Sequence, residues 1–379
     1  MAVEQHEQRV TPLELFFDLV FVFAITQVTG MLAADPTWQG LGRGMLVLGA
    51  LWWAWAAYAW LTNTTNADEG IVRLAMLAAM GAMLLVSLAV PEAFGEHGVL
   101  FGVAYLLVRL LHVALYVLAG RGDRDLLRAV LSFTPTVIVG SGLIVLAGFL
   151  DGAPQVMLWV LALTLDYLGP LVSRGRGWRL SPAHFAERHG LIVIIALGES
   201  IVALGVGAAE EPLGVGLVSA SLLAVGAIAA LWWAYFDVVA IVAQRKLSEA
   251  RGAVRATLAR DSYSYLHLPM IAGIVLFALG LKTTFAHLDD PLDTVPAVGL
   301  FGGLALYLLA HVVFRWRNVR SVSRRRLVAA AVLLALVPAA GSMSALAALA
   351  GAAAVCVGLV AYEAVRFREE RWQVRHAPA

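Results

Sequence analysis

Long apolar runs alternate with short polar segments along almost the whole chain. A helix needs about 20 apolar residues to cross a hydrocarbon core about 30 Å thick. Hydropathy and charge place runs of that length at 12–34, 44–61, 71–90, 99–119, 126–150, 154–172, 182–209, 214–243, 262–281 and 295–314. The last run, 327–365, is too long for one crossing and just long enough for two, with a turn within 338–344. The pattern predicts an all-α polytopic membrane protein with about twelve transmembrane helices.

The composition places the chain in the same class. Of its 379 residues 61% are hydrophobic and 14% are charged, whereas a soluble globular chain is about half apolar and a quarter charged. The single cysteine, Cys356, lies in an apolar stretch, which excludes a disulfide framework and a thiolate metal cluster. Neither lysine, Lys246 or Lys282, belongs to a G-x-x-x-x-G-K-[ST] motif, so a pump with its own P-loop is excluded. We expect no cofactor, no metal and no nucleic-acid partner, and no catalytic motif is present.

Basic residues are distributed unevenly between the two sides of the predicted membrane. Of the 27 lysines and arginines, all but Arg43, Lys282 and Arg109 fall at the termini or at the loops after even-numbered spans. Cytoplasmic loops are the ones enriched in lysine and arginine. The distribution predicts cytoplasmic termini and an even number of spans. The first apolar run lacks an A-x-A-like cleavage site, so we expect it to be a retained span.

Several short segments recur six spans apart in the same order. LWWAW (51–55) resembles LWWAY (231–235), and FGVAYLLVRLLHV (101–113) resembles FGGLALYLLAHVV (301–313). Glu14 and Glu187 open corresponding spans. One such match is consistent with chance among leucine-rich helices, but the set predicts a parallel 6+6 internal repeat, which is a common build of secondary transporters. The expected segments are a cytoplasmic tail (1–11), a first repeat (12–172), a basic linker (173–181), a second repeat (182–367) and a cytoplasmic tail (368–379).

Two carboxylates stand deep inside predicted spans. Asp18 lies six residues past Pro12, about 9 Å into its helix at about 1.5 Å per residue. A charge at the centre of a span costs about 2.5–3.5 kcal/mol on insertion scales, so such a residue indicates function unless it pairs two helices. Glu199 lies about 18 Å into the seventh span, and Gln27 reaches a comparable depth in the first. Glu14 shares a helix face with Asp18 but also fits a helix start favoured by the dipole.

Further ionisable residues lie within the predicted spans. Arg109 is the only basic residue near mid-membrane, and we expect it to neutralise Asp18 or Glu199, either as a structural pair or in a substrate or proton role. His112 lies on the same helix face as Arg109. We expect His112 and its counterpart His311 to be hydrogen-bonded core residues or proton carriers, and we favour both roles over haem ligation. Seven side chains fall in the cytoplasmic halves of their spans and predict a hydrated vestibule on that side: Glu14, Asp18, Asp166, His189, Asp237, His267 and His311.

Three segments resemble the signatures of the bacterial low temperature requirement A (LtrA) family. They are ELFFDLVFVFAITQ (14–27), ERHGLIVIIALGES (187–200) and YLHLPMIAGIVL (265–276), and family-like spans cover most of the chain. The resemblance implies a multi-pass protein of the bacterial plasma membrane, in a family named for a growth phenotype in the cold, and it supplies no reaction. It implies that the polar motif positions are Glu14, Asp18, Gln27, Glu187, Glu199 and His267.

The repeat and the buried acids favour a secondary transporter or permease-like protein. It would move a small solute or ion with proton coupling through Asp18 and Glu199, with membrane lipid as its other partner. Two other classes stay open, namely a non-transporting sensor or lipid-interacting factor linked to cold adaptation, and an intramembrane redox or lipid enzyme that uses histidines and acids. A sensor is less favoured because no soluble domain is appended.

Overall fold

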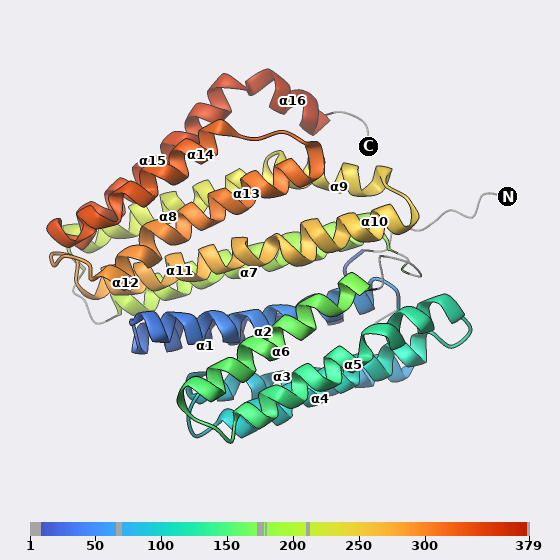
Figure 1. Ribbon diagram of the computed structural model, residues 1–379. Coiled ribbons are helices and arrows are strands. Elements are labelled where there is room, and N and C mark those ends of the chain that lie inside the picture. Colours follow the sequence, from blue (N-terminus) through green and yellow to red (C-terminus); the bar gives the residue numbers. More distant parts are fainter. Residues whose placement is uncertain (1–8, 66–69, 173–177, 179, 210–212, 377–379) are drawn as a thin grey trace. The chain divides into compact units, whose positions relative to one another are not determined.

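A computed structural model describes residues 9–65, 70–172, 178, 180–209 and 213–376 (Figure 1). Most of the tail expected at 1–11 and most of the linker expected at 173–181 lie outside these residues, as does the chain from 377 onward. The described residues form helices joined by short connections and no β-strand, which confirms the all-α class.

Each of the first six predicted spans corresponds to one helix. These are α1 (Pro12–Ala34), α2 (Trp38–Thr62), α3 (Gly70–Ala89), α4 (Gly98–Ala119), α5 (Arg124–Ala147) and α6 (Gly152–Val172). The later helices are α7 (Pro182–Ala208), α8 (Val215–Phe236), α9 (Val239–Glu249), α10 (Gly252–Leu258), α11 (His267–Ala286), α12 (Thr294–Ala297), α13 (Gly303–Val319), α14 (Arg324–Leu336), α15 (Ala345–Arg366) and α16 (Arg368–His376). Two π-helical segments, η2 (Ala259–Tyr265) and η3 (Val298–Gly302), directly precede α11 and α13.

Eleven helical segments of the described residues are long and apolar enough to cross a membrane. The sixth predicted span is not among them, although α6 has 21 residues; it carries Asp166 and an internal proline, Pro170. The last apolar run divides where expected, because a 3-10 turn, η4 (Pro338–Ser342), separates α14 from α15. Large apolar side chains such as Leu74 and Phe149 are exposed along the helices, and this surface suits lipid. The protein is therefore a multi-pass membrane protein.

The chain forms two compact units. Unit 1 comprises residues 1–28, 42–189 and 247–260, and unit 2 comprises 29–41, 190–246 and 261–379. The boundaries fall inside α1, α2, α7, α9 and η2, so neither unit is one continuous stretch of chain. The expected division into repeats at 12–172 and 182–367 stays a prediction.

In unit 1, helices that follow one another in the sequence pack side by side. α3 packs against α4, α4 against α5, and α5 against α6. α5 begins with a side-chain cap, because Asp123 accepts hydrogen bonds from the N–H groups of Asp125 and Leu126. The rings of Phe101 on α4 and Trp159 on α6 pack with their centroids 5.0 Å apart. This packing brings α4 and α6 close enough for a buried polar contact.

In unit 2, α11 packs against α13, α13 against α14, and α8 against α15. α11 and α13 cross at two glycines. A Cβ atom on Gly303 would lie 2.6 Å from the carbonyl oxygen of Gly273, and a Cβ atom on Gly273 would lie 2.6 Å from the carbonyl oxygen of Gly303. Small residues allow this close approach of two backbones within a membrane.

We expect Gly303→Ala to destabilise the protein by about 1–3 kcal/mol, because the added methyl group has no room at the crossing. Gly358→Ala is the matched control within unit 2, since nothing lies within 4 Å of a Cβ atom built there. Thermal unfolding in detergent measures both variants. A melting temperature of Gly303→Ala equal to that of the wild type would contradict the close contact.

Candidate functional site

The N-terminus of α1 positions an acidic side chain through a capping box. The hydroxyl of Thr11 accepts a hydrogen bond from the N–H of Glu14 at 3.3 Å, and Glu14 Oε2 accepts one from the N–H of Thr11 at 2.9 Å. Pro12 is the first residue of the helix, a position whose N–H has no acceptor within the helix, so proline loses no hydrogen bond there. Asp18 follows one turn later on the same face. Glu14 and Asp18 are buried, with 1% and 0% of their surface exposed.

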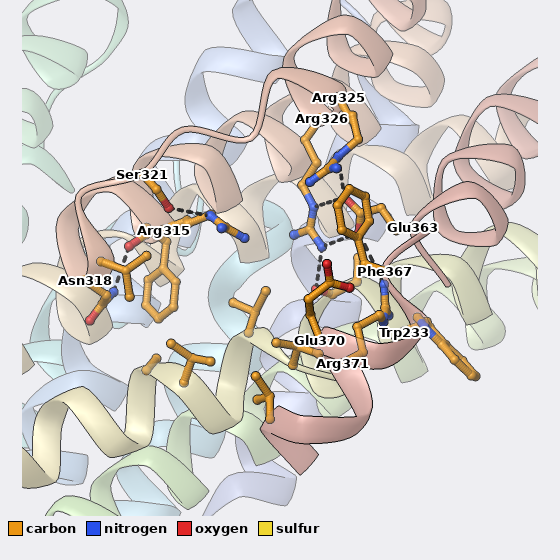
Figure 2. A pocket seen from close by; sticks show the side chains of 18 residues that line it. Trp233, Arg315, Asn318, Ser321, Arg325, Arg326, Glu363, Phe367, Glu370 and Arg371 are labelled. Atoms are coloured by element: carbon orange, nitrogen blue, oxygen red, sulfur yellow. Dashed lines mark hydrogen bonds and ion pairs between the residues drawn. The ribbon is translucent and has the colours of Figure 1, made fainter. Parts of the chain in front are cut away.

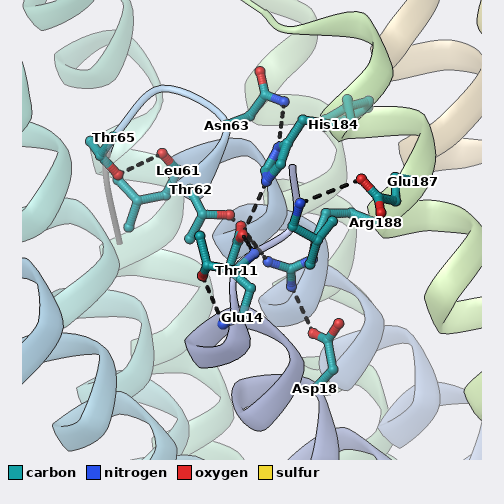
Figure 3. Close-up of polar contacts among 12 residues, drawn as sticks. Thr11, Glu14, Asp18, Leu61, Thr62, Asn63, Thr65, His184, Glu187 and Arg188 are labelled. Atoms are coloured by element: carbon teal, nitrogen blue, oxygen red, sulfur yellow. Dashed lines mark hydrogen bonds and ion pairs between the residues drawn. The ribbon is translucent and has the colours of Figure 1, made fainter. Parts of the chain in front are cut away.

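α7 supplies two basic side chains at the same spacing. His184 and Arg188 are four residues apart and share a helix face. Arg188 Nη1 donates to Glu14 Oε1 at 2.8 Å, and its Nη2 donates to Asp18 Oδ1 at 2.7 Å (Figure 3). Arg188 Nη1 also donates to the hydroxyl of Thr62 at 3.2 Å. One fully buried guanidinium therefore bridges two carboxylates.

The hydrogen bonds of Asn63 orient the side chain of His184. The N–H of Ser181 donates to Asn63 Oδ1 at 2.7 Å, which fixes the orientation of the amide. Asn63 Nδ2 then donates to the carbonyl of Ser181 and to His184 Nδ1, each at 3.0 Å. These bonds hold the ring of His184 so that Nε2 lies 3.0 Å from Glu14 Oε2.

Asp18 is paired through only one of its oxygens. Oδ1 accepts hydrogen bonds from Arg188 and, at 2.9 Å, from Trp55 Nε1. Oδ2 has no hydrogen-bond partner in the part of the chain that the structure describes. Two carboxylates thus share one guanidinium in this buried site. A proton on Asp18 would lower the negative charge of the cluster, and buried charge is costly.

Arg109 pairs with an acid other than the expected Asp18 or Glu199. Its Nη2 donates to Asp166 Oδ1 at 3.3 Å, and its Nη1 donates to the hydroxyl of Tyr105 at 3.3 Å. The Tyr105 hydroxyl in turn donates to Asp166 Oδ2 at 3.3 Å. The prediction that Arg109 neutralises Asp18 is wrong, because Arg188 already bonds that carboxylate. α4 and α6 are joined by this second buried pair.

The remaining predicted residues of unit 1 differ in burial. His112 and His189 are buried, and each contacts a backbone carbonyl through one ring nitrogen, at 3.1 and 2.8 Å. Gln27 is half-buried. Glu187 is exposed and accepts a hydrogen bond from the N–H of Val10 at 3.4 Å. Glu187 therefore belongs to the surface of unit 1.

Two predicted residues of unit 2 are buried along α7 and α11. Glu199 has 2% of its surface exposed. His267 Nε2 lies 2.8 Å from the hydroxyl of Tyr235, and its Nδ1 lies 3.0 Å from the carbonyl oxygen of Ser262. Ser262 belongs to η2, and π-helical turns are frequent at functional sites.

Arginines of the C-terminal helices engage the two other predicted residues of unit 2. Arg326 Nη1 donates to His311 Nδ1 at 2.9 Å. The same guanidinium donates to both oxygens of Glu363, at 3.3 and 3.1 Å. Asp237 is paired with Arg371 of α16. These groups lie at the end of unit 2 that carries the C-terminal helix.

The sequence model described as "Bacterial low temperature requirement A protein (LtrA)" matches residues 9–361. The chain belongs to the LtrA family. It is 31% identical to "Uncharacterized protein RA0937" of Rhizobium meliloti (strain 1021) over 289 residues, which are 72% of this chain and 69% of that protein. No solved structure matches the chain. The matched range of the LtrA family includes both helices of the Glu14–Asp18–His184–Arg188 cluster.

Sequence reasoning on this LtrA-family chain missed several members of that cluster. His184, Asn63 and Trp55 were not predicted, and Arg188 was placed only at the start of its span. A usable signal was present, because Glu14 and Asp18 have the same four-residue spacing as His184 and Arg188. Two acids and two bases at equal helical spacing are able to pair across two adjacent helices.

The described residues contain no group of three or more histidine, cysteine or acidic side chains placed to hold a metal ion. The hydrated vestibule stays a prediction for this LtrA-family protein. Glu14, Asp18 and Asp166 are at most 2% exposed and bonded to protein groups.

Proposed function

We propose that the protein is a secondary transporter of a small solute or ion in the bacterial plasma membrane, with cytoplasmic termini and with proton coupling through Asp18. The observation that carries this proposal is the α1–α7 cluster, in which two buried carboxylates share Arg188 and Asp18 Oδ2 has no described partner. An acid that takes up and releases a proton within a membrane is what proton coupling requires.

Protonation of Asp18 changes how firmly α1 and α7 are held together. When Asp18 is ionised, both carboxylates attract Arg188; when it is neutral, only Glu14 does so by charge. Hydrogen bonds between ionised groups are about twice as strong as those between neutral groups. Proton exchange therefore alters a helix contact inside unit 1, and such a contact is a suitable switch for a transport cycle.

Contacts of the same kind in the two units support the proposed parallel 6+6 repeat. In unit 1 the hydroxyl of Tyr58 on α2 donates to a backbone carbonyl of α4 at 2.9 Å, and its ring packs against His112 with centroids 5.5 Å apart. In unit 2 the ring of Tyr235 on α8 packs against His311 on α13 with centroids 5.8 Å apart, whereas the hydroxyl that donates to a backbone carbonyl of the other helix is that of Tyr307 on α13. The pairs α2–α4 and α8–α13 are the ones whose sequences match.

Glu199 is the second proton-carrying acid in this proposal. It is as deeply buried in unit 2 as Asp18 is in unit 1, with 2% of its surface exposed. Gly198 beside it has open space around a Cβ atom, so the helix backbone is not crowded there. We assign Glu199 to proton coupling on the basis of this burial.

Proton flux into proteoliposomes tests the proposal. Full-length protein is reconstituted with a pH-sensitive dye inside the vesicles, and a panel of small solutes and inorganic ions is added outside. We expect at least one solute to drive proton movement, and Asp18→Asn to slow it at least tenfold, because Asn keeps the shape of the side chain but does not exchange a proton at this site. Glu199→Gln should slow it as well.

Asp125→Asn is the matched control, because Asp125 is 78% exposed and pairs with Arg128 on the same helix. Its flux should equal that of the wild type. Flux unchanged by Asp18→Asn, or no proton movement with any solute of the panel, would contradict the proposal.

A further inference from the structure

Unit 2 contains a cavity that the transport proposal does not use. Its volume is about 430 Å³, and it lies where α8, α9, α13, α14, α15 and α16 meet (Figure 2). Its apolar wall includes Val238, Val242, Phe314 and Phe367. Small-molecule sites are commonly cavities of about 300–1,000 Å³ with mostly apolar walls and a few placed polar groups.

The charged side chains that line this cavity are mostly basic. They are Arg315, Arg325, Arg326, Arg371, Glu363 and Glu370. The four guanidinium groups exceed the two carboxylates, so the cavity has an excess of positive charge. An apolar cavity with excess positive charge favours an anion attached to an apolar body.

The four arginines differ in how many of their N–H groups donate hydrogen bonds to protein acceptors. Arg326 is bonded to Glu363 and His311, and Arg371 is paired with Asp237. Arg315, in contrast, makes one hydrogen bond with the part of the chain that the structure describes, from Nε to the hydroxyl of Ser321 at 2.8 Å.

Arg325 also has donors to spare. Its guanidinium lies 3.9 Å from the centroid of the Phe367 ring and 4.0 Å from Glu363. Its Nε has no hydrogen-bond partner within the described part of the chain. Arg315 from the end of α13 and Arg325 from the start of α14 therefore both line the cavity, and each has N–H groups without a hydrogen-bond partner among the described residues.

The start of α14 adds a second source of positive potential. Arg324, Arg325 and Arg326 occupy its first turn, where the helix dipole is positive and favours acidic residues instead. Ser323 at the N-cap makes no capping bond, and its buried hydroxyl lacks a partner among the described residues. A bound anion beside this turn would offset the unfavourable charge.

We propose that this cavity binds a phosphate group attached to a small organic body, with Arg315 and Arg325 as the anion-binding side chains. The planar guanidinium presents paired donors that match phosphate oxygens. The apolar wall contacts the carbon skeleton of the organic body. Basic pockets between transmembrane helices are known to hold phosphate headgroups, so an anionic lipid and a soluble phosphate ester both supply this chemistry.

Ligand-dependent thermal stability of the full-length protein tests the proposal. The protein is purified in neutral detergent, stripped of lipid, and melted with increasing phosphatidylglycerol, glycerol 3-phosphate or unphosphorylated glycerol. We expect a saturable rise in melting temperature with a phosphate compound and none with glycerol. A rise with phosphatidylglycerol alone assigns the phosphate to a lipid, and a rise with glycerol 3-phosphate as well assigns it to a soluble ester.

Variants separate this site from general attraction to the basic surface. Arg315→Gln with Arg325→Gln should raise the half-saturating concentration at least tenfold, because each removes a charge-assisted contact. Arg324→Gln is the matched control, since this neighbour in the same helical turn does not line the cavity. Ser321→Asp leaves every arginine in place, adds a negative charge beside Arg315, and should weaken binding too. No rise with either phosphate compound, or equal weakening by Arg324→Gln, would overturn the proposal.

Discussion

Arg188→Met is expected to destabilise the protein by about 3–5 kcal/mol, because removal of one partner leaves uncompensated charge in a buried site. Among the described residues Arg188 is the one guanidinium bonded to Glu14 and Asp18, and none of its side chain is exposed. Methionine fills similar volume but donates nothing, so both carboxylates lose their counter-charge. The free energy of unfolding in mixed micelles, or the melting temperature in detergent, measures the loss.

A rescue experiment separates charge from packing at this position. The triple variant Glu14→Gln, Asp18→Asn and Arg188→Met removes all three charges and should recover much of the stability lost by Arg188→Met alone. Arg128→Gln is the surface control, since Arg128 is 77% exposed and its pair with Asp125 contributes less than about 1 kcal/mol. A triple variant no more stable than Arg188→Met would show that packing, and not charge, dominates.

Arg109→Leu should have the second large effect, again about 3–5 kcal/mol. Asp166 would keep only the hydroxyl of Tyr105, at 3.3 Å, in a position where 1% of its side chain is exposed. The loss appears as a lower melting temperature in the same detergent. Arg326→Leu should cost less, because Glu363 keeps Arg371 at 3.8 Å and Arg325 at 4.0 Å.

The double variant Arg109→Leu with Asp166→Leu tests the reason for that loss. Replacing a buried ion pair by apolar residues of similar volume is often neutral or stabilising. The double variant should therefore be more stable than Arg109→Leu alone, and a positive coupling energy in the double-mutant cycle measures the pair. Additive losses would mean that Arg109 and Asp166 do not depend on one another.

The spans were predictable because each crossing requires its own apolar run. The turn before α15 was predictable too, because the run at 327–365 is too long for one crossing and contains Pro338 and Gly341. α6 begins and ends within two residues of the span predicted at 154–172. Hydropathy thus located the helices well, including α1, which carries the two buried acids Glu14 and Asp18.

The partners of the buried acids were not predictable from depth alone. Hydropathy places a residue along the membrane normal but does not say which helices are neighbours. Arg109 and Asp18 were predicted to lie at compatible depths in the membrane. The packing of α4 instead places the guanidinium of Arg109 in hydrogen-bond contact with Asp166. Arg188, one and a half turns into α7, reaches Asp18 instead. Helix adjacency is a property of tertiary packing, and only the equal spacing of the 14/18 and 184/188 pairs hinted at it.

The central claim is that Asp18 exchanges a proton within the buried cluster. Infrared difference spectroscopy of the purified protein on acidification follows this directly, through the carboxylic-acid C=O stretch of a newly protonated acid. We predict a band in the wild type that disappears in Asp18→Asn and is retained in Asp125→Asn. A difference spectrum of Asp18→Asn identical to that of the wild type would contradict the claim.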